Sequence, residues 1–269
     1  MVFYAAAKYN SMKHAFSVVI VCKNEAAAIG PVLQSVQHLT DDVVVYDNGS
    51  TDDTIAVVTA YKNVKLHQGP WLGFGKTKQA ATALAKYDWV LSLDADEALD
   101  ETLQQELQQL QFENNKTVYN LAYKNFLGNT HVKWGEWGFD GHIRLFNRNT
   151  VSWNDAPVHE ELLLPENAVI KKLKGHVLHR TMKDTVEYSH KVVRYALLNA
   201  DKYFAKGKKS TWVKRAVSPR FAFVKYYIFM LGFLDGWAGL VCARMTAFYT
   251  FLKYTRLHEL RQLKAKNQH

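Results

Sequence analysis

The first hundred residues alternate short apolar runs with segments of helical periodicity. β-Branched apolar runs of four to seven residues are typical of strands buried on both faces, and strands that alternate with helices need crossover connections. We therefore predict an α/β fold, a mostly parallel sheet flanked by helices. The expected strands are residues 16–22, 43–46, 64–66 and 89–93, and the expected helices are 26–38, 53–61 and 76–86.

Beyond residue 118 the pattern becomes aromatic and glycine-bearing. Strands are expected at 119–126, 142–147 and 169–173, and helix returns over 183–204. This pattern predicts one domain over residues 16–182, in which residues 16–100 form a nucleotide-binding-like half and residues 101–182 complete its pocket. Residues 1–15 form an N-terminal extension, in which Met12 is an alternative start to Met1, and residues 183–269 form a C-terminal helical segment.

Residues 221–254 are the most aromatic part of the chain. Lys225, Asp235 and Arg244 interrupt them, so no stretch is long and uncharged enough to span a bilayer. Aromatic residues beside a basic run favour a helix in the plane of an anionic membrane surface. A helical hairpin that packs on the core of the protein explains the same aromatic pattern equally well. The basic run contains Lys202, Lys206, Lys208, Lys209, Lys214 and Arg215.

Charge and cysteine content narrow the class of protein. The chain has 269 residues and a formal charge of +9, which favours nucleic acid, an acidic membrane face or phosphorylated substrates as partners. Cys22 and Cys242 are far apart in sequence, so we expect buried free thiols in a reducing compartment. The first 15 residues have no basic leader and only a short apolar run, so no secretory signal is expected.

Polar residues follow the expected strands where each one ends. Ligands of parallel α/β sheets bind beyond the carboxyl ends of the strands, and Asn24, Asp47, Asp94 and Asp96 all lie there. Asp94 and Asp96 lie on the same side of an extended chain and offer the oxygen ligands that Mg²⁺ or Mn²⁺ prefers, beside a diphosphate. A loop or helix cap is the alternative for this pair.

Other polar groups could recognise a nucleotide. Asp47 can accept a hydrogen bond from a uracil imide or a ribose hydroxyl, although an Asx turn with an N-cap is the alternative for residues 47–52. Lys76 and Lys78 follow a glycine-bearing loop and could lie near phosphates. Arg144 and Arg148 could contact phosphate through bidentate hydrogen bonds, or be solvated strand residues.

Four motifs in order resemble the GT-A (Rossmann-like) fold of family 2 glycosyltransferases. They are Val-Ile-Val-Cys-Lys-Asn-Glu25, Asp47-Asn-Gly-Ser-Thr-Asp, Gly75-Lys-Thr-Lys-Gln and Leu93-Asp-Ala-Asp-Glu. Later segments are similar to bacterial lipopolysaccharide-core β-glucosyltransferases that modify inner-core heptose. These segments begin at Trp134, Pro157 and Phe233.

The resemblance implies that residues 16–182 are the catalytic domain, with a nucleotide-binding half at 16–100 and an acceptor half at 101–182. It also implies roles for particular residues. Asn24, Glu25 and Asp47 would face the nucleotide, and Asp94 and Asp96 would face the metal and diphosphate. To these nucleotide-sugar-binding residues we add Lys76 and Arg144, whose charges could contact the phosphates. His179 would complete the metal site, with a structural histidine as the alternative. The family is inverting, which requires a base for the acceptor hydroxyl. We place that base at Glu160, with Glu161, Asp140 and Asp155 as rivals.

The resulting hypothesis is a metal-dependent hexosyltransferase. It would move glucose from UDP-glucose to a hydroxyl of a lipopolysaccharide or lipooligosaccharide inner-core acceptor, using Mg²⁺ or Mn²⁺, as a cytoplasmic protein in peripheral contact with the inner face of the membrane. Transfer to a polyprenyl phosphate is an alternative. A non-catalytic, basic nucleic-acid-binding protein is a second alternative, but no motif of that class is present. Tyr119, Tyr123, Trp134 and Trp137 could stack on sugar rings or belong to the core.

Overall fold

The computed structural model describes residues 15–155 and 160–266. The chain forms two compact units. Unit 1 contains the residues up to Tyr123 and Gly141–His179, and unit 2 contains Lys124–Asp140 and the residues from Arg180 onward. Residues 124–140 thus group with the C-terminal helices, whereas the boundaries expected from the sequence remain predictions. The possible start at Met12 lies outside the described residues.

The main sheet has the order β3-β2-β1-β4-β8-β6-β11-β5. β1, β2, β3 and β4 pair in parallel, as predicted, while β8 lies antiparallel to both β4 and β6, and β5 lies antiparallel to β11. The strands are β1 (Ser17–Cys22), β2 (Val43–Asp47), β3 (Val64–Gln68), β4 (Trp89–Asp94), β5 (Glu97–Leu99), β6 (Thr117–Leu127), β8 (Gly141–Asn147) and β11 (Val169–Met182). A short β7 (Thr130–Val132) pairs with the end of β6, and β9 (Ser152–Trp153) pairs with β10 (Leu162–Leu163).

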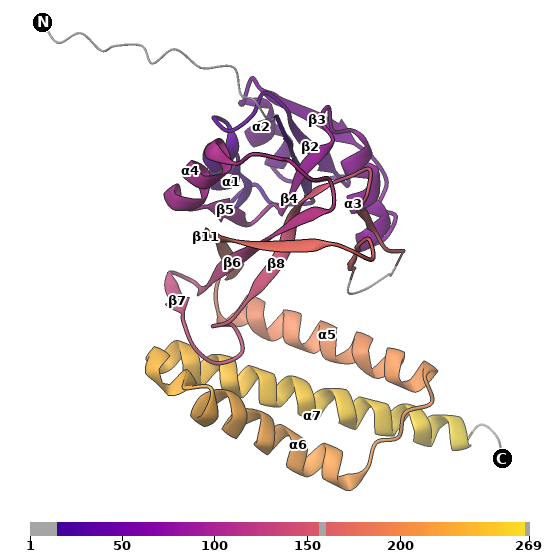
Figure 1. Cartoon of the computed structure of the whole chain (residues 1–269). Helices are drawn as coiled ribbons and strands as arrows, with labels where there is room; N and C mark the ends of the chain where they lie inside the picture. Colours follow the sequence, from indigo (N-terminus) through magenta and orange to yellow (C-terminus); the bar gives the residue numbers. More distant parts are fainter. Residues whose placement is uncertain (1–14, 156–159, 267–269) are drawn as a thin grey trace, which may run out of the picture. The chain divides into compact units, whose positions relative to one another are not determined.

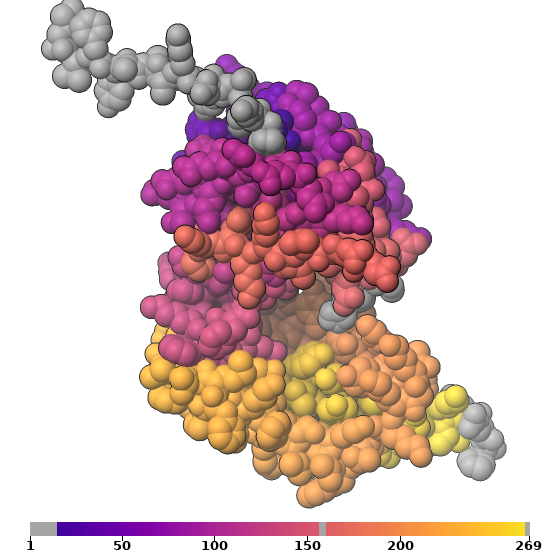
Figure 2. Space-filling view, viewed as in Figure 1, coloured from indigo at the N-terminus to yellow at the C-terminus, as the bar shows by residue number. Residues whose placement is uncertain are grey.

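Helices cover both faces of the parallel strands. Alternate residues of β1 pack in opposite directions: Val18 joins a core with Leu33 of α1, whereas Val19 joins a second core with Ala81 of α3. This arrangement explains why β1, β2 and β4 are apolar at most positions. Little of the indigo β1 is visible in the space-filling view (Figure 2). The helices of unit 1 are α1 (Ile29–Val36), α2 (Thr54–Thr59), α3 (Phe74–Ala83) and α4 (Glu101–Gln109), shown in Figure 1.

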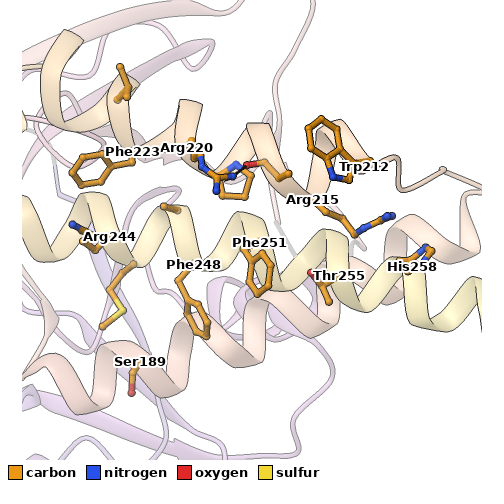
Figure 3. Close-up of a pocket in the computed structure, with 15 residues that line it drawn as sticks. Ser189, Trp212, Arg215, Arg220, Phe223, Arg244, Phe248, Phe251, Thr255 and His258 are labelled. Atoms are coloured by element: carbon orange, nitrogen blue, oxygen red, sulfur yellow. Dashed lines mark hydrogen bonds between the residues drawn. The ribbon is translucent and has the colours of Figure 1, made fainter.

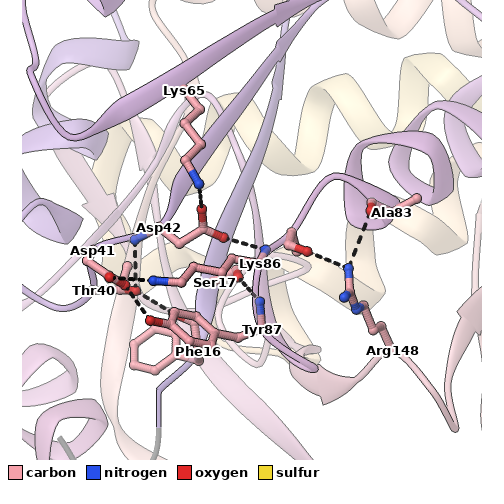
Figure 4. Close-up of polar contacts among 11 residues, drawn as sticks. Phe16, Ser17, Thr40, Asp41, Asp42, Lys65, Ala83, Lys86, Tyr87 and Arg148 are labelled. Carbon is pink, nitrogen blue, oxygen red and sulfur yellow. Dashed lines mark hydrogen bonds and ion pairs between the residues drawn. The ribbon is translucent and has the colours of Figure 1, made fainter.

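A polar network ties the beginnings of the strands together (Figure 4). The carboxylate of Asp42, just before β2, is fully buried. It accepts hydrogen bonds from Lys65 Nζ at 2.6 Å and from the backbone N–H of Lys86 at 2.7 Å. Ser17 Oγ, at the start of β1, accepts from the N–H of Tyr87 at 2.9 Å. Because this network lies at the opposite end of the strands from Asp94, we assign it to stability.

Unit 2 is mainly helical. α5 (Thr185–Ala205) and α6 (Trp212–Val224) both run along α7 (Gly236–Lys266), and a π-helical turn (Lys225–Phe229) and a 3₁₀ turn (Gly232–Asp235) connect α6 to α7 (Figure 1). Its core includes Leu127, Tyr188 and Cys242. Cys242 and Cys22 of unit 1 are both buried free thiols, as expected. Among the described helices, none could cross a bilayer alone, but α6 with its π-helical turn and the segment Gly232–Lys266 reach the required length and composition together, with a 73° bend between them.

Candidate active site

The carboxyl ends of three parallel strands bring the expected polar residues to one edge of unit 1. In the register of β1, Cys22 lies beside Asp47 of β2, and Val21 lies beside Asp94 of β4. Adjacent strands are separated by about 4.8 Å, so the backbones of Asp47 and Asp94, on either side of β1, are about 10 Å apart. This edge is the place where parallel sheets bind ligands.

The side chain of Asp47 organises the loop that follows β2. Its carboxylate is buried and accepts from the backbone N–H of Gly49 and of Ser50, both at 3.0 Å, and from the Ser50 hydroxyl. Burial raises the pKa of Asp47, but these hydrogen bonds outweigh it and hold the pKa below its usual value. The Asx-turn alternative is therefore present in the structure, and Asp47 positions the loop.

Asn24 and Glu25 connect this loop to the end of β1. Asn24 has a left-handed backbone (φ 57°), and its Oδ1 accepts from the Thr51 N–H at 2.7 Å. The N–H of Glu25 donates to Thr54 Oγ1 at 2.8 Å, while Asp52 accepts from the Thr54 N–H at 3.1 Å. Asp52 therefore binds the backbone N–H of Thr54, the first residue of α2, whereas the N-cap position is Asp53, whose side chain makes no capping hydrogen bond. These contacts hold the loops between β1 and α2 in one arrangement.

Lys78 of α3 joins two carboxylates at the strand edge. Its Nζ lies 2.8 Å from Asp94 Oδ1 and 2.9 Å from Glu160 Oε1, and only 7% of its side chain is exposed. Burial lowers the pKa of Lys78, but the attraction of Asp94 and Glu160 for the ammonium outweighs burial, and the pKa lies above its ordinary value. The ammonium therefore remains charged. Trp153 lies under the ammonium, with its ring centroid 5.0 Å away.

Arg144 of β8 holds the other oxygen of Asp94. Its Nη2 lies 3.2 Å from Asp94 Oδ2 and 2.9 Å from Glu97 Oε1, and its Nε donates to Tyr123 Oη at 2.7 Å. Burial raises the pKa of Asp94, yet Lys78 and Arg144 together hold it well below its usual range. The guanidinium expected to contact phosphate is thus largely engaged within the protein.

Asp96 and His179 form a second pair beside this cluster. Residues 95–96 form a turn instead of extending β4, so Asp94 and Asp96 take different partners. His179 Nε2 lies 3.3 Å from Asp96 Oδ2. Burial lowers the pKa of His179, but the hydrogen bond with Asp96 raises it above the ordinary value. His179 lies within β11, which extends well beyond the strand expected at 169–173.

The three expected metal ligands do not form one cluster. Within residues 15–155 and 160–266, no group of three or more His, Cys, Asp or Glu side chains could hold a metal ion. The carboxylate of Asp94 is paired with Lys78 and Arg144. The carboxylate of Asp96 contacts the imidazole of His179 instead. This pair offers one carboxylate oxygen and one imidazole nitrogen, which are ligand types that a divalent cation such as Mn²⁺ accepts.

The structure separates Glu160 from its rivals. Glu160 is 18% exposed in its side chain and contacts Lys78, whereas the side chain of Asp155 is 79% exposed and lies 3.7 Å from Lys76. Glu161 is exposed beside Asn154, and Asp140 of unit 2 accepts from Asn125 Nδ2 at 3.1 Å. Among the candidates in unit 1, only Glu160 joins the Asp94 cluster.

The other residues expected to bind ligands lie outside the Asp94 cluster or within the protein core. Lys76 is half exposed at the start of α3. Arg148 donates to the backbone carbonyl of Ala83 at the end of α3, at 3.3 Å (Figure 4), and to that of Ala85 just beyond it, at 2.6 Å. Tyr119 and Tyr123 are buried in the core of unit 1, so neither offers an open face to a sugar.

Sequence reasoning did not assign the central role of Lys78. The motif Gly75-Lys-Thr-Lys-Gln contains two lysines, and the sequence alone does not show that Lys78 and not Lys76 is the buried one. A helix signal was available, because Lys78 and the buried Ala81 and Thr82 recur at spacings of three and four residues and share one face of α3. That spacing directs Lys78 towards the sheet.

Comparison with known proteins identifies relatives. A family model described as glycosyl transferase family 2 matches residues 17–163 and confirms the resemblance and the GT-A fold expected from the motifs. An uncharacterised glycosyltransferase of Rickettsia typhi is 30% identical, over 93% of this chain and 89% of that protein. The lipopolysaccharide core biosynthesis glycosyltransferase LpsC of Rhizobium meliloti is 28% identical, over 93% and 94%. The structure of S. aureus TarS residues 1–349 with UDP-GlcNAc is 17% identical, with a TM-score of 0.47, over 93% and 92%.

Proposed function

Because this chain belongs to glycosyltransferase family 2, we propose that it transfers a hexose, with inversion, from a nucleotide sugar to an acceptor hydroxyl. The observation that carries the proposal is the bridge from Asp94 through Lys78 to Glu160 at the carboxyl edge of the sheet. It combines a buried cation with a carboxylate that can act as a base. Lys78 fixes the position of Glu160, and the ends of β1 and β2 supply the loops for the nucleotide.

In the proposed reaction the acceptor oxygen forms a bond to the anomeric carbon while the bond from that carbon to the diphosphate oxygen breaks. The diphosphate leaves with the bonding electrons, and Glu160 takes the proton of the acceptor hydroxyl. Lys78 lies where its positive charge would offset the charge that develops on the diphosphate. Asp47 and Asn24 act before the transfer step, because their hydrogen bonds hold the loops that bind the nucleotide.

A divalent metal ion, if bound, would be held by Asp96 and His179. It would stabilise negative charge on the leaving diphosphate. Of the two expected ions, Mn²⁺ suits a mixed carboxylate and imidazole pair better than Mg²⁺, which prefers oxygen ligands. We therefore refine the expected cofactor to Mn²⁺.

Removal of Asp96 tests this assignment. Asp96→Ala should abolish metal-stimulated transfer while leaving the circular dichroism spectrum and the unfolding temperature close to those of wild type, because Asp96 lies in a partly exposed turn. Turnover should be measured with Mn²⁺, with Mg²⁺ and with a chelator. Near-normal turnover of Asp96→Ala in the presence of chelator would remove the metal from the proposal.

For substrates, we propose UDP-glucose as donor and the inner core of a lipopolysaccharide or lipooligosaccharide as acceptor. The acceptor class is supported by the similarity to LpsC, which extends over 93% of this chain. The glucose and uridine assignments rest on the motif resemblance. Since the acceptor is lipid-linked, we also propose a cytoplasmic location with peripheral contact at the inner face of the membrane.

A polyprenyl phosphate acceptor is the alternative within the same family. Its phosphate oxygen is already anionic, so it needs no general base. Glu160→Gln distinguishes the two, because transfer to a hydroxyl should fall by about 100-fold or more, whereas transfer to a phosphate should change little. Family membership favours either transferase over the nucleic-acid-binding alternative.

A further inference from the structure

A long apolar groove follows α7 in unit 2 (Figure 3). Its volume is about 1230 Å³, and it is lined by Phe248 and Phe251 of α7 and by Phe223 of α6. The α7 lining residues recur from Arg244 to His258 at spacings of three and four, so they occupy one face of the helix. At about 1.5 Å per residue this face extends about 21 Å, which exceeds the roughly 15 Å depth of one leaflet's hydrocarbon.

The α6 wall of the groove is open to solvent. None of the residues of α6 is buried, and Trp212, which lines the groove, is 68% exposed. Phe221 of the same helix is not a lining residue, and it is 61% exposed. The turns after α6 expose Phe229 (73%) and Leu234 (55%) as well. A helix of a soluble protein normally buries one apolar face, and large exposed apolar surfaces mark protein or membrane contacts. This surface therefore needs a partner.

Three arginines give the groove a positive charge. Arg215, Arg220 and Arg244 line it, and no Asp or Glu is among the described residues that do so. Arg215 and Arg220 each donate to a carbonyl of nearby backbone, and Arg244 lies 5.0 Å from the ring centroid of Phe223. Within the described parts of the chain, none of the three forms an ion pair with a carboxylate. Their charges remain available to a phosphate.

A lipid fits this combination better than a second copy of the chain. In a two-fold symmetric dimer the same patch meets itself, which would bring the arginines of two grooves together. An anionic phospholipid offers acyl chains for the phenylalanines and a phosphate for the arginines.

We propose that the groove between α6 and α7 binds an anionic phospholipid of the membrane, with an acyl chain along Phe248 and Phe251 and the phosphate at Arg220 and Arg244. This inference deepens the proposed function, since it rests on the proposed membrane contact. It does not depend on the transfer chemistry, so donor binding and binding of phosphatidylglycerol are separate measurements.

Vesicle binding by the full chain tests the site. Arg220→Gln combined with Arg244→Gln should weaken binding to vesicles of phosphatidylcholine and phosphatidylglycerol by about tenfold or more. The matched control is Lys171→Gln with Lys172→Gln, which removes the same charge from two exposed positions of unit 1. The control should bind within a few-fold of wild type. Circular dichroism establishes that each variant is folded.

Tryptophan fluorescence tests the position of the acyl chain. Phosphatidylglycerol with brominated acyl chains should quench wild-type fluorescence more than it quenches Trp212→Phe, because Trp212 lines the groove. Equal loss of binding in the arginine and lysine variants, or equal quenching of wild type and Trp212→Phe, would overturn the proposal. Unchanged vesicle binding with a raised KM for the glycolipid would assign the groove to the acceptor, and an arginine-dependent dimer would assign it to a second copy.

Discussion

At the scale of single residues, Lys78 combines a structural and a chemical role. Its ammonium is the contact that joins Asp94 to Glu160, and it is almost fully buried. A buried cation between two carboxylates cannot be removed without leaving charge that is poorly compensated. The position of the proposed base therefore depends on a lysine of a different element.

Lys78→Met should lower kcat by about 100-fold, because Glu160 loses the contact that positions it. It should also lower the free energy of unfolding by about 3 kcal/mol. Steady-state kinetics at saturating donor and acceptor, with chemical denaturation, measure both effects. Lys62→Met is the control, since Lys62 is exposed between α2 and β3. Turnover of Lys78→Met within a few-fold of the control would contradict this role.

Asp42 contributes to stability in a pH-dependent way. Burial raises its pKa, but Lys65, Ser17 and the N–H of Lys86 lower it below the ordinary value, so the native state binds protons less readily than the unfolded chain. Its contribution is therefore complete above the unfolded pKa of about 3.9 and is lost as the pH falls towards the native pKa.

Asp42→Asn should lower the free energy of unfolding at neutral pH by about 1–3 kcal/mol. The difference from wild type should shrink as the pH falls below about 4. Denaturation at a series of pH values measures this, with Asp88→Asn as an exposed control. A difference that stays constant across the acid range would contradict the role of the Asp42 carboxylate.

At the scale of elements, the close packing of α3 sets the position of Lys78. A Cβ at Gly75 would lie 1.9 Å from the backbone oxygen of Asn154. Backbone atoms cannot easily move away, so only glycine allows α3 this close to the segment after β9. By contrast, the nearest atom to a Cβ at Gly30 in α1 is 3.9 Å away.

Gly75→Ala should therefore destabilise the protein by about 1–3 kcal/mol and lower kcat by displacing Lys78. Gly30→Ala, the same change in another helix, should be neutral or stabilising by up to about 1 kcal/mol. Thermal unfolding and kinetics of the two variants provide the comparison. Equal stability of the two variants would show that the approach to Asn154 does not constrain α3.

The elements that were predictable from sequence have strong local patterns. β1, β2 and β4 are continuous β-branched or leucine-rich runs, and their period and length mark buried parallel strands. β5 and the far end of β11 have no such signal, because they are short or partly polar and depend on pairing between residues 97–99 and 177–179. Helix α4 is not among the helices expected from the sequence, although Asp100 caps it and Leu103 and Leu107 share one face.

At the scale of the whole molecule, the two ends of the parallel strands have different tasks. Asp42 and Ser17 stabilise the beginnings of the strands, while Asp47 and Asp94 lie at their carboxyl ends. The sequence predicted that these ends form the site, because topology requires it. It did not predict that Arg144 would turn inward to Glu97 and Tyr123, since such pairings join distant elements and leave no local pattern.

The measurement that tests the central claim most directly is hexosyl transfer by purified wild type and Glu160→Gln, with a panel of nucleotide sugars and an inner-core glycolipid. We predict that wild type consumes one hexosyl donor and forms a product with inverted anomeric configuration, seen by NMR. Glu160→Gln should still be stabilised against heat by the same donor, but transfer should fall by about 100-fold or more. Wild-type rates in Glu160→Gln, or retention of configuration, would contradict the account.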